Sequence, residues 1–408
     1  MNDNYFGKRI LIVGSGISGK GAAYALKQCG ALIYFFDGKF IDGIDLIVMS
    51  PGVKEEQFVE YAAKHHINIV SEIEVGYSLD NAPVCAITGT NGKTTTTMLI
   101  GDMLTKSGLE PIVSGNIGSS YAKDSLKSHK SSVIEVSSFQ LLNIREFKPN
   151  VAVITNITPD HLDRHKNMQN YINAKLNICI NQTSSDYLIV PREVRRLIKE
   201  FGAKSQIVTL GSDVKIENGY LVVFGKRIIK IEQLPIKEEH NINDASFACA
   251  ASILMGANID AINQALLSFK PALHRLSFVG NFDGKNFYND SKGTNIGATL
   301  AATKSMNGTT ALIAGGSDKG YEFDELFIDL PNNVKYVIGM GEVKEKLCNA
   351  AQRQGYGSFI PCSDLVDGVR IAKLLDVANV LLSPAAASFD SYEGYDKRGE
   401  HFERLIRE

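Results

Sequence analysis

Residues 86–99, AITGTNGKTTTTML, join an apolar strand to a helix through a turn with two glycines. Glycines let successive backbone N–H groups point into one concavity, and the helix N-terminus adds positive partial charge. Lys93 and Thr94 follow Gly92 directly and supply the ammonium and hydroxyl that a triphosphate and its Mg²⁺ require. The stretch therefore predicts a nucleotide triphosphate site. Its spacing departs from G-x-x-x-x-G-K-[ST], because Ile87 stands at the first glycine position, and a plain glycine-rich turn is the alternative.

Length and composition exclude several classes of protein. The chain has 408 residues, too many for one ordinary core, with 44% hydrophobic and 22% charged residues, as in globular proteins. A net charge of −2 lacks the excess of positive charge that is typical of nucleic-acid-binding proteins. No apolar run is long enough to span a membrane. The N-terminus lacks the apolar region of a signal peptide, and the six cysteines form no C-x-x-C pair. We expect a cytoplasmic protein with reduced cysteines.

Residues 8–37 predict a strand, a turn, a helix over 22–29 and a second strand. The turn GSGISG (14–19) is followed 18 positions later by Asp37, which is typical of dinucleotide-binding units but is also compatible with a nucleotide sugar. The next strand, 45–50, ends in Pro51-Gly52 and places a second tight loop at the same sheet edge. Because ligands bind at such edges, we expect a small nucleotide-binding domain.

The middle of the chain predicts a buried, mostly parallel sheet, because near-continuous apolar strands alternate with helices. The strands are expected at 84–88, 111–115, 131–137 and 150–157, a β-rich stretch at 187–231 and a long helix at 240–256. Polar residues follow the strand ends, namely Asn116, Glu135, His161 and Asp163. The carboxyl ends of parallel strands share one edge, so we expect these side chains beside the phosphate loop.

The last third predicts a further open α/β sheet with glycine-rich strand ends. Strands are expected near 285–289, 310–314, 334–338 and 380–382, and a charged helix at 401–407.

Glu135 and Thr94 offer the hard oxygen ligands that Mg²⁺ prefers. Taken alone, His161 is as compatible with a capping or surface histidine as with a functional one, and Lys175 is interpreted as a solvated helix lysine. Nothing in the spacing makes Lys175 a metal ligand, because an ammonium has no lone pair.

The whole chain resembles the Mur ligases of bacterial cell-wall synthesis, and most closely the branch that adds D-glutamate. The matching motifs are TGTNGKTT (88–95), SGNIG (114–118), EVSSFQL (135–141), TNITPDHLDRH (155–165), YINAK (171–175), HN (240–241), LHR (273–275), NDSKGTN (289–295), GGSDK (315–319), LSPAAASFD (382–390) and YDKRG (395–399). GSGISG with MSPG in the first domain, and the SPAAASFD ending, favour the D-glutamate-adding branch.

The resemblance and the patterns together predict an α/β protein of three domains. These are an N-terminal Rossmann-like nucleotide-sugar domain (1–82), a central P-loop-type ATPase domain with a mostly parallel sheet (83–271) and a C-terminal Rossmann-like α/β domain that binds the amino acid (272–408). Sites divided among three domains imply closure on binding, with hinges near residues 82 and 271.

The resemblance also implies the ligands and their contacts. ATP would contact Gly89, Thr90, Asn91, Gly92, Lys93, Thr94, Thr95, Asn241, Arg275 and Asp290. One Mg²⁺ would bind Thr94 and Glu135, and a second would bind His161 and a Lys175 carbamylated by CO₂. UDP-MurNAc-L-Ala would be held by Ile17, Ser18, Asp37, Ser50, Pro51, Gly52 and Asn116, and D-glutamate by Thr294, Lys319, Ser388 and Tyr395.

The implied reaction is phosphoryl transfer followed by amide formation. The alanyl carboxylate attacks the γ-phosphate to give an acyl phosphate and ADP, and the D-glutamate amine then displaces phosphate. Lys93, Glu135, His161 and Lys175 would be the catalytic groups, largely through positioning and charge neutralisation. We expect a cytoplasmic monomer with small-molecule substrates, no nucleic acid partner and no membrane insertion.

Departures from the family pattern leave some contacts open. Asp244 stands where the family has an asparagine near adenine, and a carboxylate can only accept hydrogen bonds. Gly38 and Lys39 offer fewer donors at the uracil end than the family's usual Thr-Arg, and Tyr395 replaces a frequent phenylalanine.

Four alternatives remain. They are a neighbouring ligase that adds another amino acid, a folylpolyglutamate synthase, an NAD-binding oxidoreductase and a non-catalytic paralogue. GSGISG argues against the folate enzyme, the Lys93 loop and Glu135 against the oxidoreductase, and the complete catalytic set against the paralogue.

Overall fold

The computed structural model describes residues 3–54, 56–235, 238–269 and 274–408. Its contacts divide the chain into two compact units, Met1–Ile157 with Gln169–Lys270 (the first unit) and Thr158–Met168 with Pro271–Glu408 (the second unit). Within the described residues the strands form four sheets. No helix in these ranges is long and apolar enough to cross a membrane.

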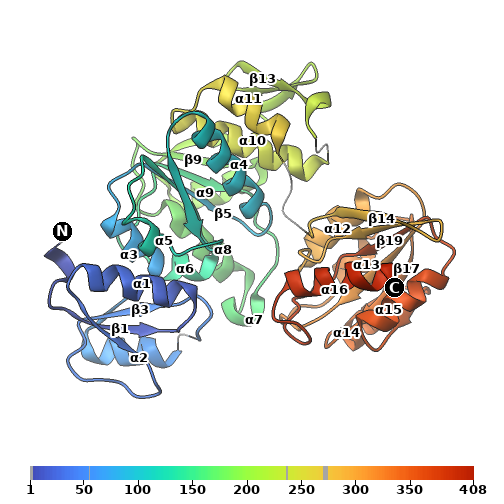
Figure 1. The fold of residues 1–408 in the computed structure, drawn as a ribbon, viewed down its shortest axis with the longest axis horizontal. Helices are drawn as coiled ribbons and strands as arrows, with labels where there is room; N and C mark the ends of the chain where they lie inside the picture. The colour runs from blue at the N-terminus through green and yellow to red at the C-terminus, as the bar shows by residue number, and fades with distance from the viewer. Residues whose placement is uncertain (1–2, 55, 236–237, 270–273) are drawn as a thin grey trace. The chain divides into compact units, whose positions relative to one another are not determined.

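The first sheet of the first unit is parallel throughout, with strand order β2-β1-β3-β4. Its strands are β1 (Arg9–Val13), β2 (Leu32–Phe35), β3 (Leu46–Met49) and β4 (Asn68–Ser71), and its helices are α1 (Ile17–Gln28), α2 (Glu56–His65) and α3 (Glu72–Leu79). Its strands β1 and β3 lie between α1 and α2 (Figure 1). Helix α1 begins five residues before the predicted start. Its early glycines are sites of close approach rather than turn residues, since a Cβ at Gly19 would collide with the Gly14 carbonyl and one at Gly21 with Ser120.

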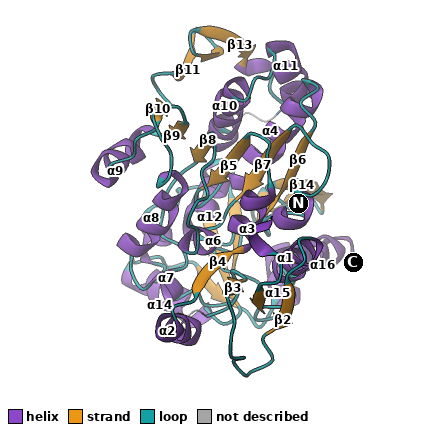
Figure 2. Cartoon of the chain, turned by 90° about the vertical axis from the view of Figure 1, so that its left-hand side faces the viewer, coloured by secondary structure: helices purple, strands orange, loops and turns teal. Residues whose placement is uncertain are grey.

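The second sheet, also in the first unit, confirms the predicted buried parallel sheet. Its strand order is β10-β9-β8-β5-β7-β6 with every pair parallel, and Figure 2 shows the strands in this order. The strands are β5 (Val84–Thr88), β6 (Pro111–Gly115), β7 (Ser131–Glu135), β8 (Val151–Ile154), β9 (Tyr187–Val190) and β10 (Gln206–Thr209).

One face of the second sheet is covered by α4 (Lys93–Lys106), which packs against α10 (Glu239–Leu254) and α11 (Ile259–Ser268). Cys85, Ile87, Ile100 and Phe247 are among the buried residues of this core. The remaining described elements of this region are α5 (Tyr121–Asp124), α6 (Ser138–Leu142), α8 (Met168–Leu176), α9 (Arg195–Phe201) and an antiparallel sheet of β11 (Val214–Glu217), β12 (Tyr220–Val223) and β13 (Lys226–Lys230).

The second unit contains a sheet of strand order β14-β15-β19-β16-β17-β18, parallel except for the β14–β15 pair. The strands are β14 (Ser277–Phe282), β15 (Lys285–Asn289), β16 (Thr310–Gly315), β17 (Val334–Met340), β18 (Phe359–Pro361) and β19 (Asn379–Leu382). The helices are α7 (Leu162–His165), α12 (Ile296–Lys304), α13 (Asp324–Ile328), α14 (Lys344–Arg353), α15 (Leu365–Leu374) and α16 (Tyr395–Arg407).

Three features of the second unit were not predicted from sequence. The edge strands β14 and β18 lack a continuous apolar pattern, because β14 is nowhere fully buried and β18 has three residues. Helix α16 begins at Tyr395 rather than residue 401, since Arg398 and Gly399, which look like surface residues in the sequence, are buried.

The predicted domain division near residue 82 falls between α3 and β5, inside the first unit. The predicted division and hinge near residue 271 lie outside the described residues. The three-domain division and the hinges stay predictions.

Candidate active site

The phosphate loop, residues 89–92, connects β5 to the first residue of α4. Gly92 caps α4 in the left-handed region with φ 83°, and its position has no side-chain cap hydrogen bond. A helix N-terminus of this kind favours an anion. Gly89 has φ 147°, and a Cβ there would collide with the Thr155 hydroxyl. Only glycine therefore fits at either position.

Two residues that sequence reasoning left without a role hold this loop. The Asn91 N–H donates to Asn156 Oδ1 at 2.9 Å, and the Thr155 hydroxyl donates to the Asn91 carbonyl at 2.5 Å. The Thr90 N–H donates to the Asn156 carbonyl at 3.0 Å. In the sequence, the indication for this role is the position of Thr155 and Asn156 directly after β8, because β8 lies beside β5.

Two lysine ammonium groups converge on one carbonyl of the loop. Lys93 Nζ donates to the Gly89 carbonyl at 2.9 Å and to the Thr90 carbonyl at 2.8 Å. Lys175 Nζ, on α8, donates to the same Gly89 carbonyl at 2.6 Å. Lys175 is only 2% exposed, which excludes the solvated helix lysine considered above. Two cations beside a helix N-terminus favour a highly charged anion.

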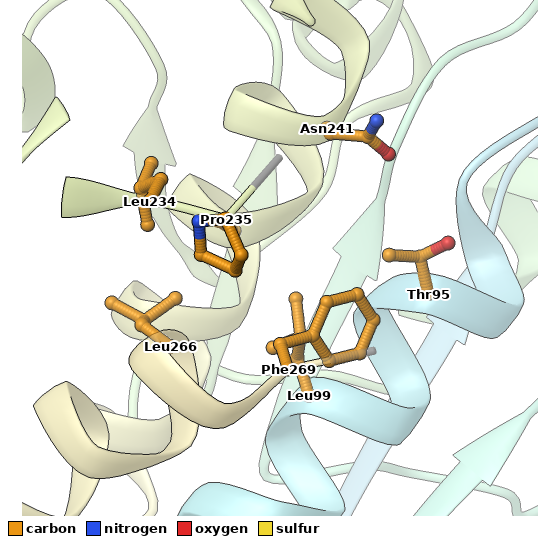
Figure 3. Close-up of a pocket in the computed structure, with 8 residues that line it drawn as sticks. Thr95, Leu99, Leu234, Pro235, Asn241, Leu266 and Phe269 are labelled. Carbon is orange, nitrogen blue, oxygen red and sulfur yellow. The ribbon is translucent and has the colours of Figure 1, made fainter. Parts of the chain in front are cut away.

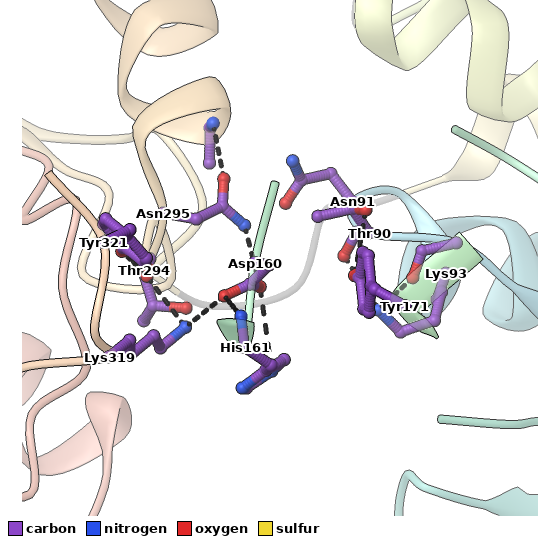
Figure 4. A network of polar contacts seen from close by, with 12 residues as sticks. Thr90, Asn91, Lys93, Asp160, His161, Tyr171, Thr294, Asn295, Lys319 and Tyr321 are labelled. Carbon is purple, nitrogen blue, oxygen red and sulfur yellow. Dashed lines mark hydrogen bonds and ion pairs between the residues drawn. The ribbon is translucent and has the colours of Figure 1, made fainter. Parts of the chain in front are cut away.

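Tyr171 connects α8 to the loop. Its hydroxyl lies 3.0 Å from the Thr90 hydroxyl (Figure 4). Its ring centroid is 4.6 Å from Lys175 Nζ. The YINAK motif thus contributes both Lys175 and Tyr171, the aromatic residue that contacts it.

Glu135, at the end of β7, has the properties of a metal ligand. It is 2% exposed, and its Oε1 accepts a hydrogen bond of 2.9 Å from the Asn116 side-chain amide. Its Oε2 is buried without a hydrogen-bond partner among the described residues. A buried carboxylate oxygen without a donor is costly, and a divalent cation would satisfy it, so the Glu135 carboxylate fits Mg²⁺.

Asp244, which the family pattern places near adenine, lies against the phosphate loop. It is 4% exposed, and a Cβ at Gly92 would collide with its carboxylate. A carboxylate at this position faces the positive end of α4.

An apolar pocket borders the first turns of α4 (Figure 3). Two predicted ATP residues, Thr95 and Asn241, lie on it. The other labelled lining residues are Leu99, Leu234, Pro235, Leu266 and Phe269. An apolar pocket with one amide at its rim suits a flat heteroaromatic base.

The residues predicted to bind the uridine diphosphate meet at the carboxyl edge of the first sheet. Ser50, Pro51 and Gly52 follow β3, Asp37 follows β2, and Ile17 and Ser18 begin α1, whose cap Gly16 has no described side-chain hydrogen bond. Ser50 Oγ is buried without a hydrogen-bond partner in the described chain, and a Cβ at Gly14 would approach it to 2.7 Å. The edge therefore has a free hydroxyl and an open helix terminus.

The second unit places the His161 segment against two predicted D-glutamate residues. Lys319 Nζ lies 3.0 Å from Asp160 Oδ1 and donates to the Thr294 carbonyl at 3.0 Å (Figure 4). A Cβ at Gly320 would approach Asp163 to 2.9 Å. His161 has φ 54°, and its N–H donates to Asp160 Oδ1 at 2.9 Å.

The two compact units divide the residues that were expected at one sheet edge. Residues 158–168, with His161 and Asp163, belong to the second unit, whereas Glu135 and Lys175 belong to the first, so their meeting at one edge stays a prediction. Past the end of β8, Asp160 contacts Asn295 and Lys319. Asp160, which precedes His161 in the quoted motif, was missed.

Asp290, Ser388 and Tyr395 are further predicted site residues of the second unit. Asp290, directly after β15, accepts from the Ser383 hydroxyl at 2.6 Å and from the Leu276 N–H at 3.2 Å, next to Arg275. Burial raises the pKa of Asp290 to about 7. The hydrogen bond from Ser383 and the charge of Arg275 lower this pKa, but their effect is smaller than that of burial. Ser388 is buried, whereas Tyr395, the first residue of α16, is 37% exposed.

Comparison with known proteins places these features in a family. Residues 87–251 match the model of the Mur ligase middle domain, which covers the phosphate loop, Glu135, Lys175 and Asp244. A curated protein of Caldanaerobacter subterraneus subsp. tengcongensis, named UDP-N-acetylmuramoylalanine--D-glutamate ligase, is 36% identical over 445 aligned residues, covering 98% of each chain. The chain belongs to the Mur ligase family.

Two further relatives agree with this Mur ligase assignment. A protein of the same name from Staphylococcus aureus strain JH9 is 39% identical, covering 99% of this chain and 98% of its own. The solved structure of MurF ligase from Thermotoga maritima in complex with ADP has a TM-score of 0.62 at 15% identity, covering 100% of this chain and 97% of that one. The structural likeness confirms the α/β Mur ligase fold.

Proposed function

We propose that this chain is an ATP-dependent ligase that joins D-glutamate to UDP-N-acetylmuramoyl-L-alanine and releases ADP and phosphate. The two relatives named for D-glutamate addition, aligned over nearly the whole chain, support the choice of substrates. The observation that carries the proposal is the convergence of Lys93 and Lys175 on the Gly89 carbonyl. It places two cations at a glycine loop that opens a helix, where a nucleotide triphosphate would bind.

The ATP phosphates would be held by the N–H groups of residues 89–95 and by Lys93. Lys93 would exchange its contacts with the Gly89 and Thr90 carbonyls for the phosphate oxygens. Thr94 and Glu135 would hold Mg²⁺, which when bound neutralises charge on the phosphates. Asn241 would reach the base from the apolar pocket, and Arg275 and Asp290 would contact the nucleotide.

The chemistry would proceed through an acyl phosphate. The alanyl carboxylate attacks the γ-phosphorus, the bond to the ADP oxygen breaks, and Lys93 stabilises the charge that develops on the phosphoryl oxygens. The D-glutamate amine then attacks the acyl carbonyl, loses a proton and expels phosphate. Asn116, which is oriented by Glu135, would help to hold the substrate near the phosphoryl group.

Lys175 would act as a carbamate rather than as an ammonium. Its uncharged amine would add to CO₂ with loss of one proton, which gives an oxygen ligand where the ammonium has none. The carbamate and His161 would hold a second Mg²⁺. The burial of Lys175 and its hydrogen bond to the Gly89 carbonyl support a role at the phosphates.

The two remaining substrates would bind at the other sheet edges. The uridine diphosphate would lie on the open N-terminus of α1, with Ile17, Ser18, Asp37 and the loop Ser50-Pro51-Gly52 around it. D-Glutamate would contact Thr294, Lys319, Ser388 and Tyr395. The largely buried ammonium of Lys319, already paired with one carboxylate, is suited to bind a substrate carboxylate.

We place this activity in cytoplasmic peptidoglycan precursor synthesis, carried out by a monomer. All six cysteines are free thiols, which agrees with a reducing compartment.

Phosphate release measured with one component omitted at a time tests the proposal. We expect release only when ATP, Mg²⁺, UDP-N-acetylmuramoyl-L-alanine and D-glutamate are all present. Equal or faster release with L-lysine, diaminopimelate or a folate in place of D-glutamate would overturn the assignment.

A further inference from the structure

We propose that Arg398 is a positioning residue for the amino-acid site, and that its buried guanidinium sets the shape of three loops that bind D-glutamate. This inference rests on the proposed function for the identity of the amino acid. Arg398 lies in the first turn of α16, one position before the buried Gly399, and has no role in the mechanism above.

The guanidinium is completely enclosed, since Arg398 is 1% exposed and is the largest fully buried side chain in the described chain. Nε donates to the Ser291 hydroxyl at 3.1 Å, and Nη2 donates to the Ser291 carbonyl at 2.9 Å. Nη2 also donates to the Ala386 carbonyl at 3.2 Å, and Nη1 donates to the carbonyls of Ala387 at 3.1 Å and Gly315 at 3.4 Å.

These acceptors lie on three different loops. Ser291 follows β15, Gly315 ends β16, and Ala386 and Ala387 follow β19. The three strands are neighbours in the sheet and run parallel, so the loops leave the same carboxyl edge. One rigid, planar side chain therefore joins every loop that leaves the centre of this edge.

Each loop continues directly into a residue assigned to D-glutamate. Thr294 lies three residues after Ser291, Lys319 lies four residues after Gly315, and Ser388 follows Ala387. Two of the loops also bind each other near Arg398, because the Ser317 N–H donates to the Ala387 carbonyl at 2.9 Å. The Ser291 hydroxyl joins the loop after β15 to the start of α16, where it donates to the Tyr395 carbonyl at 2.8 Å. A substitution of Arg398 is therefore expected to shift the backbone of these loops and, with it, the residues assigned to D-glutamate.

The charge of Arg398 supports the same role. Its acceptors are carbonyl and hydroxyl oxygens, and no carboxylate lies within hydrogen-bond distance among the described residues. Burial lowers the pKa of Arg398 to about 10, so the group stays charged at neutral pH. The carboxylates of Asp390 and Asp290 act on this charge through space and raise the pKa against the effect of burial. A buried cation without a hydrogen-bonded carboxylate favours a further anion nearby, and D-glutamate brings two carboxylates.

Lysine at this position would keep the charge and lose the geometry. Its ammonium has three donors on a flexible stem, whereas the guanidinium presents five in a fixed fork. Arg398→Lys therefore separates loop positioning from charge, and Arg398→Met removes both while keeping much of the volume.

The experiment is steady-state kinetics in which each of the three substrates is varied in turn. For Arg398→Lys we expect the KM for D-glutamate to rise about tenfold or more, because hydrogen bonds to a charged group are lost. The KM values for ATP and for the uridine substrate, and kcat at saturating D-glutamate, should change less than about threefold. Lys397→Ala, a neighbouring exposed residue paired with Glu400, should leave all values unchanged.

Ser291→Ala provides a second, milder variant in case the Arg398 variants do not fold. It removes one acceptor and one loop contact without burying an unpaired charge, and it should raise the same KM by a smaller factor. Addition of guanidinium ion to folded Arg398→Met should partly restore the KM for D-glutamate, which a general loss of packing would not allow.

Two results would overturn the inference. One is an unchanged KM for D-glutamate in Arg398→Lys and Ser291→Ala, and the other is a uniform loss in which all three KM values and kcat change together. Failure of the proposed function is recognised separately in the wild-type protein. If the wild type used a different amino acid, the KM for that amino acid would report on Arg398 in the same way.

Discussion

Lys319 and Asp160 form an ion pair with 3.0 Å between Nζ and Oδ1, and their side chains are only 11% and 7% exposed. Asp160 immediately precedes His161, so the pair links the proposed metal histidine to the residue proposed to bind D-glutamate. A substrate carboxylate that binds Lys319 must therefore share or replace an internal carboxylate. This relationship gives the first prediction.

Asp160→Asn should destabilise the protein in a way that D-glutamate corrects. Removing one partner of a buried ion pair leaves the Lys319 ammonium without its carboxylate, at a cost of about 3–5 kcal/mol. We expect a lower melting temperature than wild type, and a larger stabilisation by D-glutamate. In the double variant with Lys319→Met the larger stabilisation should disappear. Equal stabilisation of wild type and Asp160→Asn would show that the pair and the substrate do not compete.

Lys93→Ala should abolish phosphate release while the uridine substrate still binds. The lysine contacts the phosphate loop at the edge of the second sheet, whereas the uridine residues lie at the edge of the first. Calorimetric titration with the uridine substrate provides the binding measurement. Lys106→Ala, in the last turn of the same helix, serves as the control, because its exposed pair with Asp102 contributes little. Equal loss of binding and turnover in Lys93→Ala would contradict the division of roles.

A carbamate on Lys175 should be visible directly. With ¹³CO₂ at mildly alkaline pH we expect a carbamate carbon resonance in the wild type that is absent in Lys175→Ala. The signal should persist in Lys93→Ala, whose lysine binds the same carbonyl but is not proposed to be modified. A wild-type spectrum without the resonance would remove the second metal ligand from the proposal.

Asp244→Asn should improve the binding of ATP. The carboxylate lies against Gly92 at the N-terminus of α4, where it offsets part of the positive field that attracts phosphate. We expect the KM for ATP to fall about two- to fivefold, as a change of about 0.3–1 kcal/mol in this field implies. The KM for D-glutamate serves as the internal control. A higher KM for ATP would instead indicate that Asp244 accepts a hydrogen bond from the nucleotide.

Stability should fall with rising pH between about pH 4 and 7 because of Asp290. Burial raises the pKa of this carboxyl to about 7 from 3.8, so the folded state binds the proton more tightly than the unfolded state. The unfolding free energy then decreases as pH rises through this window, by at most about 1.4 kcal/mol per pH unit, and is constant above it.

Asp290→Asn should remove this contribution from denaturant-unfolding curves measured across the window. Glu72 needs the parallel variant Glu72→Gln, since burial raises its pKa to about 7 as well. If Asp290→Asn had the same pH dependence as wild type, Asp290 would not be buried as a protonated acid.

Much of the fold followed from local patterns. The strand at 84–88 and the threonine-rich helix start were predicted because apolar runs, glycines and a lysine–threonine pair lie within fifteen consecutive residues. The parallel second sheet was predicted because its strands are buried on both faces and are apolar throughout. Helix starts were predicted less well, since Gly19 and Arg398 look like turn or surface residues until a contact buries them.

By itself the sequence determined the phosphate loop, most of the order of strands and helices, and the places of Glu135 and Asn116 directly after strands of one sheet, because each depends on neighbours along the chain. Only the tertiary structure decided that Lys175 contacts Gly89, that Asp160 pairs with Lys319, and that Arg398 joins three loops. The physical reason is that a buried charge can be recognised only from the partners that fold around it, and these lie 86, 159 and up to 107 residues away.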